Sequence, residues 1–506
     1  MKNDSAKHFF LLIVALTITP FIIFLGKNFL QIDFFTAKYF WVTFFYCLLF
    51  ICAAAGMLIF SKKSLVFVLF FAYFSFLQFY FYNIQQFFRI FKDGANGYYV
   101  LSFIVLVSLI VAFISRSSIF RNFVLILLFL NVILSVTNLI PAIGKSFQAV
   151  FKTANIIDNS PTTSSLTLTK YPNIFYIVPD GLASPKILKD YTDIDFKHSI
   201  KKFEEKGFTV PKHSYSSYNL TYLSLAALFK MDYPVTERSL IYKDRHDLYP
   251  SIREKNPEIL QYLKKNNYKF IIIPPLWGGC PTSREYKCLT PTSNFFLSKF
   301  FQDYAVSTMF QYSFIKKFLD KFNISLVSDM NDAGKTAINK MKINPKVWSE
   351  GGVFTMIHML MPHIPYREKN CSITDRYSAP SKEGYRSTVY CSFNRIHELS
   401  DFIIKNYPNA SIVVQGDHGV YSKVYPENKK FVEISESLID YRLGAFTAVR
   451  GCNSNQAAKL NQANIVEYIV ECLVNGTQTK QFENKSFFGF YEHAPEFGKV
   501  FRVRQK

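Results

Sequence analysis

Side chains that suit a metal ion occur at two points where an apolar run ends. Asp180 stands directly before a glycine after one such run, and Asp417 and His418 lie between two glycines after another. Carboxylate oxygens and imidazole nitrogens are common ligands of divalent ions. The three residues therefore predict a mixed nitrogen and oxygen metal site, although Asp-Gly after a strand is by itself also typical of a simple turn.

Two further histidines lie in and just after a third apolar run. His358 is inside this run, and His363 follows it in the sequence Pro-His-Ile-Pro-Tyr that ends at Tyr366. A histidine near a metal ion can transfer protons or bind phosphoryl oxygens. Each of the two is equally compatible with a structural role in the interior.

A hydroxyl-rich segment supplies a nucleophile for such a site. The residues from Ser214 to Thr221 lead into an apolar helical pattern that includes Ser224, so Thr221 lies near a helix start. Backbone N–H groups and the helix dipole favour an anionic substrate and a deprotonated hydroxyl there. A helix cap is the alternative role for a threonine at this position, and spacing alone favours the cap.

The elements that must position these residues predict an α/β fold with a mostly parallel sheet flanked by helices. Continuous apolar runs indicate buried strands, and helical patterns separate them. Strands are expected at 173–179, 270–274, 352–360, 410–415 and 445–449, and helices at 196–206, 259–266, 384–405 and 463–474. Sites in such sheets form beyond the carboxyl ends of the strands, so the polar groups are expected to converge at one edge.

The first 141 residues predict a transmembrane domain of five helices. A helix of about 20 apolar residues crosses a bilayer, and runs close to this length occur at 8–25, 39–60, 64–81, 98–115 and 123–140. Basic residues in the loops favour an inside N-terminus, and five crossings then place the rest outside the cytoplasm. A Ser/Thr-rich linker is expected at 142–170 and an extracytoplasmic domain at 171–506.

The net charge of +21 is spread along the chain without a basic block. We expect attraction to anionic lipid headgroups or phosphorylated glycans and no nucleic-acid partner, although a general richness in lysine explains the charge equally well. Six cysteines lie after the apolar region, and Cys280 and Cys288 bracket a short loop that is the easiest to close. Disulfides and buried thiols both remain open for them.

The order of these motifs resembles the alkaline phosphatase/sulfatase superfamily, in the membrane-bound branch that contains phosphoethanolamine transferases and lipoteichoic-acid synthases. The resemblance spans Pro172–Val449, and the five-helix region also fits that branch. It implies Asp180, Asp417 and His418 as metal ligands. It also implies Thr221 as both nucleophile and ligand, and His363 as the residue that binds the phosphate or the leaving group.

The resemblance implies a transferase at the bacterial inner membrane. It would move a phosphoethanolamine or phosphoglycerol headgroup from a phospholipid to an envelope glycan or a lipopolysaccharide-type acceptor. One divalent ion is expected, zinc or manganese rather than calcium or magnesium. Expected substrate contacts are His358, His363, Tyr366, Ser224, Trp277 and Arg442, and packing is the alternative role for Tyr366, Trp277 and Arg442.

Departures from the family pattern limit this interpretation. The segment after Thr221 lacks the Pro and Arg of a formylglycine signal, which argues against a true sulfatase. Residues 420–441 contain no histidine, although phosphoethanolamine transferases usually carry one there, so the transferred group stays open. The alternatives are a phosphate- or sulfate-ester hydrolase and a catalytically silent scaffold for envelope assembly.

Overall fold

The computed structural model describes the part of the chain formed by residues 9, 11–16, 19, 22, 65–78, 97–115, 117–133, 137, 171–237, 256–274, 286–289, 332–364, 366–372, 381–420, 430–476, 480–490, 496 and 499–503. The chain divides into two compact units. The N-terminal unit comprises Met1–Ser164 and Thr292–Val327, and the α/β unit comprises Ser165–Pro291 and Ser328–Lys506. The predicted linker at 142–170 lies outside the described residues.

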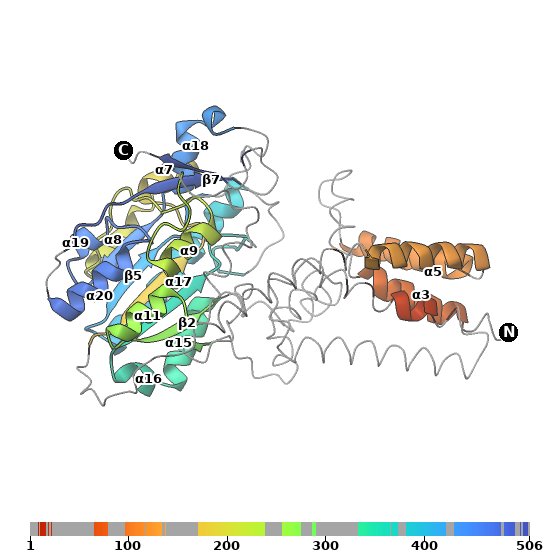
Figure 1. Cartoon of the computed structure of the whole chain (residues 1–506), viewed down its shortest axis with the longest axis horizontal. Helices are drawn as coiled ribbons and strands as arrows, with labels where there is room; N and C mark the ends of the chain where they lie inside the picture. Colours follow the sequence, from red (N-terminus) through yellow and green to blue (C-terminus); the bar gives the residue numbers. More distant parts are fainter. Residues whose placement is uncertain are drawn as a thin grey trace. The chain divides into compact units, whose positions relative to one another are not determined.

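The α/β unit is built on a six-stranded sheet with the order β3-β2-β4-β1-β5-β6 (Figure 1). The strands are β1 (Ile174–Pro179), β2 (Lys269–Ile273), β3 (Lys287–Cys288), β4 (Val353–Met359), β5 (Ser411–Gln415) and β6 (Thr447–Arg450). The first five run parallel to their neighbours, and β6 is antiparallel to β5 at one edge. The predicted α/β class with a mostly parallel sheet is therefore confirmed.

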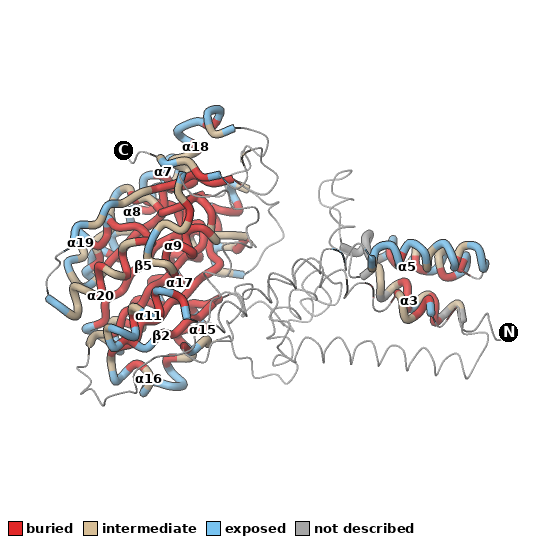
Figure 2. The backbone as a smooth tube through the Cα atoms, viewed as in Figure 1, coloured by how far each residue is buried: buried red, intermediate tan, exposed pale blue. Residues whose placement is uncertain are grey.

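The central strands are apolar on both faces because helices cover both faces. In β1, Phe175 and Ile177 pack into one core, and Ile174, Tyr176 and Val178 pack into the other. This alternation follows from the two-residue period of a strand. It explains why buried parallel strands appear in the sequence as continuous apolar runs, and the sheet is the buried interior in Figure 2.

Two layers of helices cover the sheet. One core is lined by α7 (Pro185–Thr192), α8 (Lys197–Glu205), α15 (Ala333–Ile343), α16 (Lys346–Ser349) and α17 (Lys382–Asn406). The other is lined by α9 (Thr221–Lys230), α11 (Glu258–Lys265), α19 (Ser454–Ala457) and α20 (Ile465–Asn475). A further helix, α18 (Glu436–Leu443), packs with a hairpin of β7 (Ser486–Gly489) and β8 (Val500–Val503), and a 3-10 turn covers Phe431–Glu433.

The five predicted strands and four predicted helices of this unit all occur, with ends that differ by a few residues. The sequence did not predict that the strand near 447 would be antiparallel. The connection from β5 to this strand, β6, passes through α18. The hairpin of β7 and β8 and the two-residue strand β3 were also not predicted, because each is too short to show a period.

Disulfides join Cys371 to Cys391 and Cys452 to Cys472. Cys288 is also disulfide-bonded, while Cys280 lies outside the described residues. The sequence left disulfides and buried thiols open, and the structure has disulfides at these positions. Each of the two described bridges closes a loop of 20 residues, which restricts the unfolded chain.

The described part of the N-terminal unit is helical, with α3 (Leu65–Gln78), α5 (Gly97–Ile114) and residues 118–133. Its core includes Leu69 and Ala72 of α3 and Ala112 of α5. Large apolar side chains also face outward, on α5 and on the helix after it: Phe103, Leu106, Leu109, Ile110, Phe113, Ile114, Ile119, Phe123, Ile126, Leu127, Phe129, Leu130 and Ile133.

In the residues described for this unit, no helix is both long and apolar enough to span a bilayer. The predicted run at 39–60 lies outside the described residues, and so do parts of the runs at 8–25, 64–81 and 123–140.

The packing of α17 on α8 predicts a loss of stability in acid. The ring centroids of His397 and Phe203 lie 4.2 Å apart. Burial, Lys206 and Lys202 lower the pKa of His397 from 6.5 to about 4, against the opposite effect of Asp401. Between pH 6.5 and about 4, the unfolded chain therefore binds a proton at His397 that the folded chain does not bind. The free energy of unfolding should fall as the pH drops from 6.5 to about 4.

His397→Leu should make this acid decline shallower, because it removes the titrating group. The measurement is urea unfolding with a chelator present, at steps from pH 7.5 to 4. His198→Leu, on the exposed side of α8, is the control and should leave the decline unchanged. An equal slope in the His397→Leu variant and the parent would contradict the assignment.

Candidate functional site

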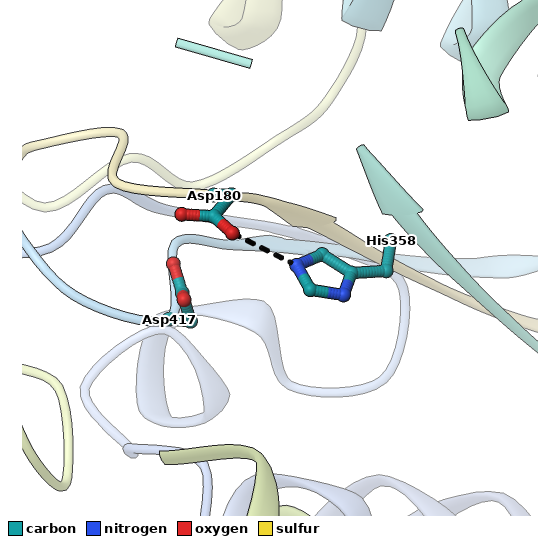
Figure 3. Close-up of side chains that lie close together, drawn as sticks. All are labelled: Asp180, His358 and Asp417. Carbon is teal, nitrogen blue, oxygen red and sulfur yellow. Dashed lines mark ion pairs between the residues drawn. The ribbon is translucent and has the colours of Figure 1, made fainter. Parts of the chain in front are cut away.

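The polar groups predicted from the sequence meet at the carboxyl ends of β1, β4 and β5. Asp180 follows β1, His358 is next to last in β4, and Asp417 lies two residues after β5. The parallel register places Val178 beside His358, which brings Asp180 and His358 to the same edge of the sheet. Figure 3 shows the two carboxylates and the imidazole ring pointing toward one another.

Backbone contacts fix the orientation of the loops that carry these side chains. The N–H of Asp180 donates to the carbonyl of Met359 at 2.9 Å, and the N–H of Gly181 donates to Asp417 Oδ1 at 2.8 Å. Gly181 has a φ of +74°, and a Cβ at this residue would lie 3.3 Å from the ring of His418. Only glycine accepts both the left-handed conformation and this contact readily.

The side-chain atoms of the site lie at separations that suit one ion. His358 Nε2 lies 3.4 Å from Asp180 Oδ2. His418 Nε2 lies 3.7 Å from both Asp180 Oδ1 and Asp417 Oδ2. The ligand atoms of Asp180, His358 and Asp417 all lie within 4.8 Å of one another. Ligands of a tetrahedral zinc ion lie roughly 3.3 Å apart when each is about 2 Å from the metal, so the cluster has the dimensions of a metal site.

Thr221 joins this cluster from the other side. It is the first residue of α9, and Leu220 is the N-cap, without a side-chain cap hydrogen bond. Thr221 Oγ1 lies 3.1 Å from His418 Nε2 and is partly exposed. The cap interpretation that spacing favoured does not apply to Thr221, because the hydroxyl of a first-turn residue faces the site and not its own helix terminus.

Two buried carboxylates give the site a strong demand for positive charge. Asp180 is 1% exposed and Asp417 is fully buried. Asp180 Oδ1 and Asp417 Oδ2 have no hydrogen-bond partner among the described residues. Buried anions need a cation or strong donors to offset the loss of hydration. The donor set of two carboxylates, imidazoles and a hydroxyl therefore fits a divalent metal ion.

The pKa of Asp180 also indicates that the cluster suits a positive charge. Burial raises the pKa of Asp180, but its interactions with the neighbouring rings of His363, His358 and His418 outweigh this effect and lower the pKa to about 2. Asp180 therefore remains a carboxylate at neutral pH. A metal ion can supply the same positive charge without requiring protonated histidines.

His418 is held in the form that binds a metal. Its Nδ1 lies 2.7 Å from the carbonyl oxygen of Gly419, which can only accept, so Nδ1 carries the proton and Nε2 presents a lone pair to the cluster. Burial lowers the pKa of His418, and Arg442 adds to this effect against the opposing charges of Asp417 and Asp180. A neutral imidazole facing the carboxylates is a metal ligand ready to bind.

His363 and Tyr366 line a small pocket beside the cluster. Nδ1 of His363 lies 2.8 Å from the carbonyl oxygen of Ile364. Because a carbonyl oxygen can only accept, Nδ1 carries the proton and donates to it. The hydroxyl of Tyr366 accepts from the N–H of Ser381 at 3.0 Å. The other residues that line the pocket are Gly181, Pro362, Ile364, Tyr385 and His418.

Other predicted site residues lie elsewhere or have different neighbours. Ser224 is fully buried and donates to the carbonyl of Tyr218 at 2.9 Å. Arg442 is fully buried and contacts backbone carbonyls. Trp277 lies outside the described residues. The predicted substrate contacts of these three residues stay predictions, and burial does not favour them for Ser224 and Arg442.

The sequence did not predict the positions that two residues, His358 and Tyr385, have at the site. His358 was expected to contact substrate, whereas the structure brings it into the metal cluster. Its place one residue before the end of a buried strand was the available signal. Tyr385 of α17 donates to the carbonyl of Gly181 at 2.9 Å and accepts from the N–H of Ala183. Nothing in the sequence distinguishes Tyr385 from the other aromatic residues of that helix.

No protein-family model and no curated protein matches the chain. Solved structures do resemble it. They include an alkaline phosphatase superfamily protein from Vibrio parahaemolyticus (10% identity, 71% of this chain, 87% of that chain, TM-score 0.42). They also include the periplasmic domain of phosphoethanolamine transferase EptC from Campylobacter jejuni (12%, 61%, 89%, 0.37).

A third is a phosphonate monoester hydrolase from Silicibacter pomeroyi (11%, 63%, 79%, 0.40). These names agree with the superfamily that the sequence motifs resemble.

The metal cluster predicts that Asp417→Asn abolishes tight metal binding. The amide oxygen can still accept from the N–H of Gly181, but the variant loses one of the two buried negative charges. Mutation of a residue that only supports a metal ligand lowers metal affinity by about 10–100-fold. Mutation of a direct ligand should therefore lower the affinity by more than ~100-fold. The measurement is metal content after dialysis, followed by titration with zinc or manganese.

Asp332→Asn is the matched control. Asp332 is also buried and pairs with Arg395 at 2.8 Å, so its variant loses a buried charge and stability without touching the cluster. It should keep full metal content. Full occupancy in the Asp417→Asn variant would remove Asp417 from the site.

Proposed function

We propose that this chain is a membrane-anchored, metal-dependent transferase of the alkaline phosphatase/sulfatase type. It moves a phosphoethanolamine or phosphoglycerol headgroup from a phospholipid to an envelope glycan or a lipopolysaccharide-type acceptor. The observation that carries the proposal is the position of Thr221 Oγ1, 3.1 Å from His418 Nε2, at a cluster that also contains the buried carboxylates of Asp180 and Asp417. A catalytically silent scaffold has no need for these groups to converge.

In this proposal Asp180, Asp417 and His418 hold the ion together with Thr221, and His358 is a further ligand. Zinc and manganese suit this set of nitrogen and oxygen donors. The bound ion would supply positive charge that lowers the pKa of the Thr221 hydroxyl and stabilises a phosphoryl group. The N-terminus of α9 adds backbone N–H groups and a favourable dipole for an anionic substrate.

The first half of the reaction transfers the headgroup to the protein. Thr221 Oγ loses its proton to water and forms a bond to the phosphorus atom of the phospholipid, while the bond from phosphorus to the glycerol oxygen breaks. His363 gives a proton to that oxygen, and diacylglycerol leaves. We assign the leaving group and the phosphoryl oxygens to the pocket lined by His363, Tyr366 and Tyr385, because this pocket lies beside the cluster.

The second half regenerates the enzyme. A glycan hydroxyl attacks the same phosphorus atom, its proton passes to His363, and the bond from phosphorus to Thr221 Oγ breaks. Thr221 Oγ then takes a proton back from water, which restores the hydroxyl. If water took the place of the glycan, the products would be those of a hydrolase. Both outcomes share the covalent intermediate on Thr221, so the acceptor distinguishes them.

The exposed apolar side chains of the N-terminal unit support a membrane location. Phe103, Leu106 and Phe113 of α5 are 41–63% exposed, and Phe129 is 64% exposed. Soluble proteins rarely expose apolar surface of this density. An anchor in the bilayer would cover these side chains and would raise the effective concentration of a lipid donor at the site. The bacterial inner membrane, with the α/β unit outside the cytoplasm, is the location we propose.

The proposal predicts that Thr221→Ala stops headgroup transfer. Loss of a covalent nucleophile lowers turnover by at least about 10³-fold in comparable enzymes. The measurement uses the full-length chain in vesicles that contain phosphatidylethanolamine or phosphatidylglycerol with a fluorescent acyl chain, and it follows the release of labelled diacylglycerol. Mass spectrometry of the parent should find the corresponding headgroup on Thr221.

Thr221→Ser, which keeps the hydroxyl, should retain part of the turnover. Thr209→Ala is the control, because the Thr209 hydroxyl contacts Ser454 and Asn455 and lies outside the cluster. Retained turnover in the Thr221→Ala variant would exclude Thr221 as the nucleophile. Release of the free headgroup, in place of a glycan that carries the headgroup, would identify a hydrolase.

A further inference from the structure

Arg442 is a buried arginine that lies between the two loops of the site. It belongs to the last turn of α18 and is fully buried. A buried guanidinium needs acceptors for its N–H groups, because it cannot lose its charge. Its position therefore shows which segments it holds together.

The guanidinium contacts both catalytic segments. One nitrogen, NH2, donates to the carbonyl of Asn219 at 2.6 Å, two residues before Thr221. The other, NH1, donates to the carbonyl of Val420 at 3.1 Å, two residues after His418. The planar, rigid fork of an arginine can reach two acceptors in fixed directions, which a lysine cannot.

Backbone contacts of the same segment strengthen this connection. The carbonyl of Arg442 accepts from the N–H of Gly419 at 2.8 Å, so Arg442 holds the loop after His418 at two points. The Gly419 backbone approaches this segment so closely that a Cβ at Gly419 would lie 2.1 Å from the carbonyl oxygen of Tyr441. The loop that carries Asp417 and His418 is thus packed directly on α18.

Hydrogen bonds also fix the position of Asn219, whose carbonyl accepts from the guanidinium of Arg442. The side chain of Asn219 accepts from the N–H of Gly489 at 2.7 Å and donates to its carbonyl at 3.0 Å. Gly489 is the last residue of β7. The segment before Thr221 is therefore held between the hairpin of β7 and β8 and the guanidinium of Arg442.

We propose that Arg442 is a positioning residue that sets the distance between Thr221 Oγ1 and His418 Nε2. This inference rests on the proposed function of those two residues, and it gives Arg442 no contact with substrate. A shift of about 1 Å between a nucleophile and the groups that activate it can lower turnover by about 10²-fold. Loss of either carbonyl contact would release one loop relative to the other.

The test compares Arg442→Lys with Arg450→Lys in the purified full-length chain. Arg450, at the far end of β6, also donates to backbone carbonyls, those of Lys206, Pro408 and Ala410. It pairs with Ile412 at the start of β5, whereas the site lies beyond the end of β5. The two variants therefore lose the same kind of contact at opposite ends of the sheet. Lysine keeps the positive charge and can keep one contact, so we expect both variants to fold.

Two readouts are needed. The first is kcat and KM for release of labelled diacylglycerol from fluorescent phosphatidylethanolamine. Arg442→Lys should lower kcat about 10–100-fold, as loss of a supporting contact does at metal sites, with KM within about threefold of the parent. The second is zinc affinity by chelator competition, which should weaken by about tenfold or more. Arg450→Lys should change neither value, although both variants should lower the melting temperature.

Each outcome decides the question. A raised KM with an unchanged kcat in Arg442→Lys would make Arg442 a substrate contact and overturn the inference. Parent-like kcat and zinc affinity, or an equal loss in Arg450→Lys, would also overturn it. If the parent itself releases no diacylglycerol, the proposed function fails, and zinc affinity alone then decides whether Arg442 positions the cluster.

Discussion

The site depends on the burial of two carboxylates at one edge of an apolar sheet. Asp180 and Asp417 are almost inaccessible to water, and the protein offers them few donors: the N–H of Gly181 for one oxygen of Asp417 and the ring of His358 for one oxygen of Asp180. Two like charges in a dry region repel and lack hydration. The fold can keep them together only if positive charge enters, either as protons on the histidines or as a cation. This need selects a metal more strongly than any single ligand does.

The parallel sheet explains how such distant residues reach one place. β1, β4 and β5 are neighbours in the sheet, so Asp180, His358 and Asp417 leave it at the same edge although up to 237 positions separate them in the sequence. The proposed nucleophile, Thr221, comes from outside the sheet, on a helix whose start is held by Asn219 and Ser224. The sheet therefore fixes the metal ligands, whereas hydrogen bonds between loops fix the hydroxyl. Arg442 takes part in the second arrangement through its contacts with the carbonyls of Asn219 and Val420.

The sequence predicted the parts of this arrangement that local chemistry determines. The strands before Asp180 and Asp417 could be recognised because burial on both faces makes them apolar throughout, and the glycines around them marked sharp turns. The position of His358 in the cluster could not be predicted, since it depends on the register between β1 and β4. The contacts of Tyr385 and Arg442 could not be predicted either, although Arg442 was expected from the sequence to be a substrate contact. Their roles come from contacts with backbone carbonyls more than 20 residues away, and these contacts leave no pattern in the sequence.

The cation and Thr221 are coupled through His418. Nδ1 of His418 is occupied by the carbonyl of Gly419, so its single lone pair at Nε2 faces both the carboxylates and Thr221 Oγ1. Without a cation, that lone pair can accept the hydroxyl proton of Thr221 and hold the oxygen in place. When a cation takes the lone pair, the hydroxyl loses its acceptor and its oxygen is left beside a positive charge. Metal binding would then activate the proposed nucleophile through the residue that had restrained it.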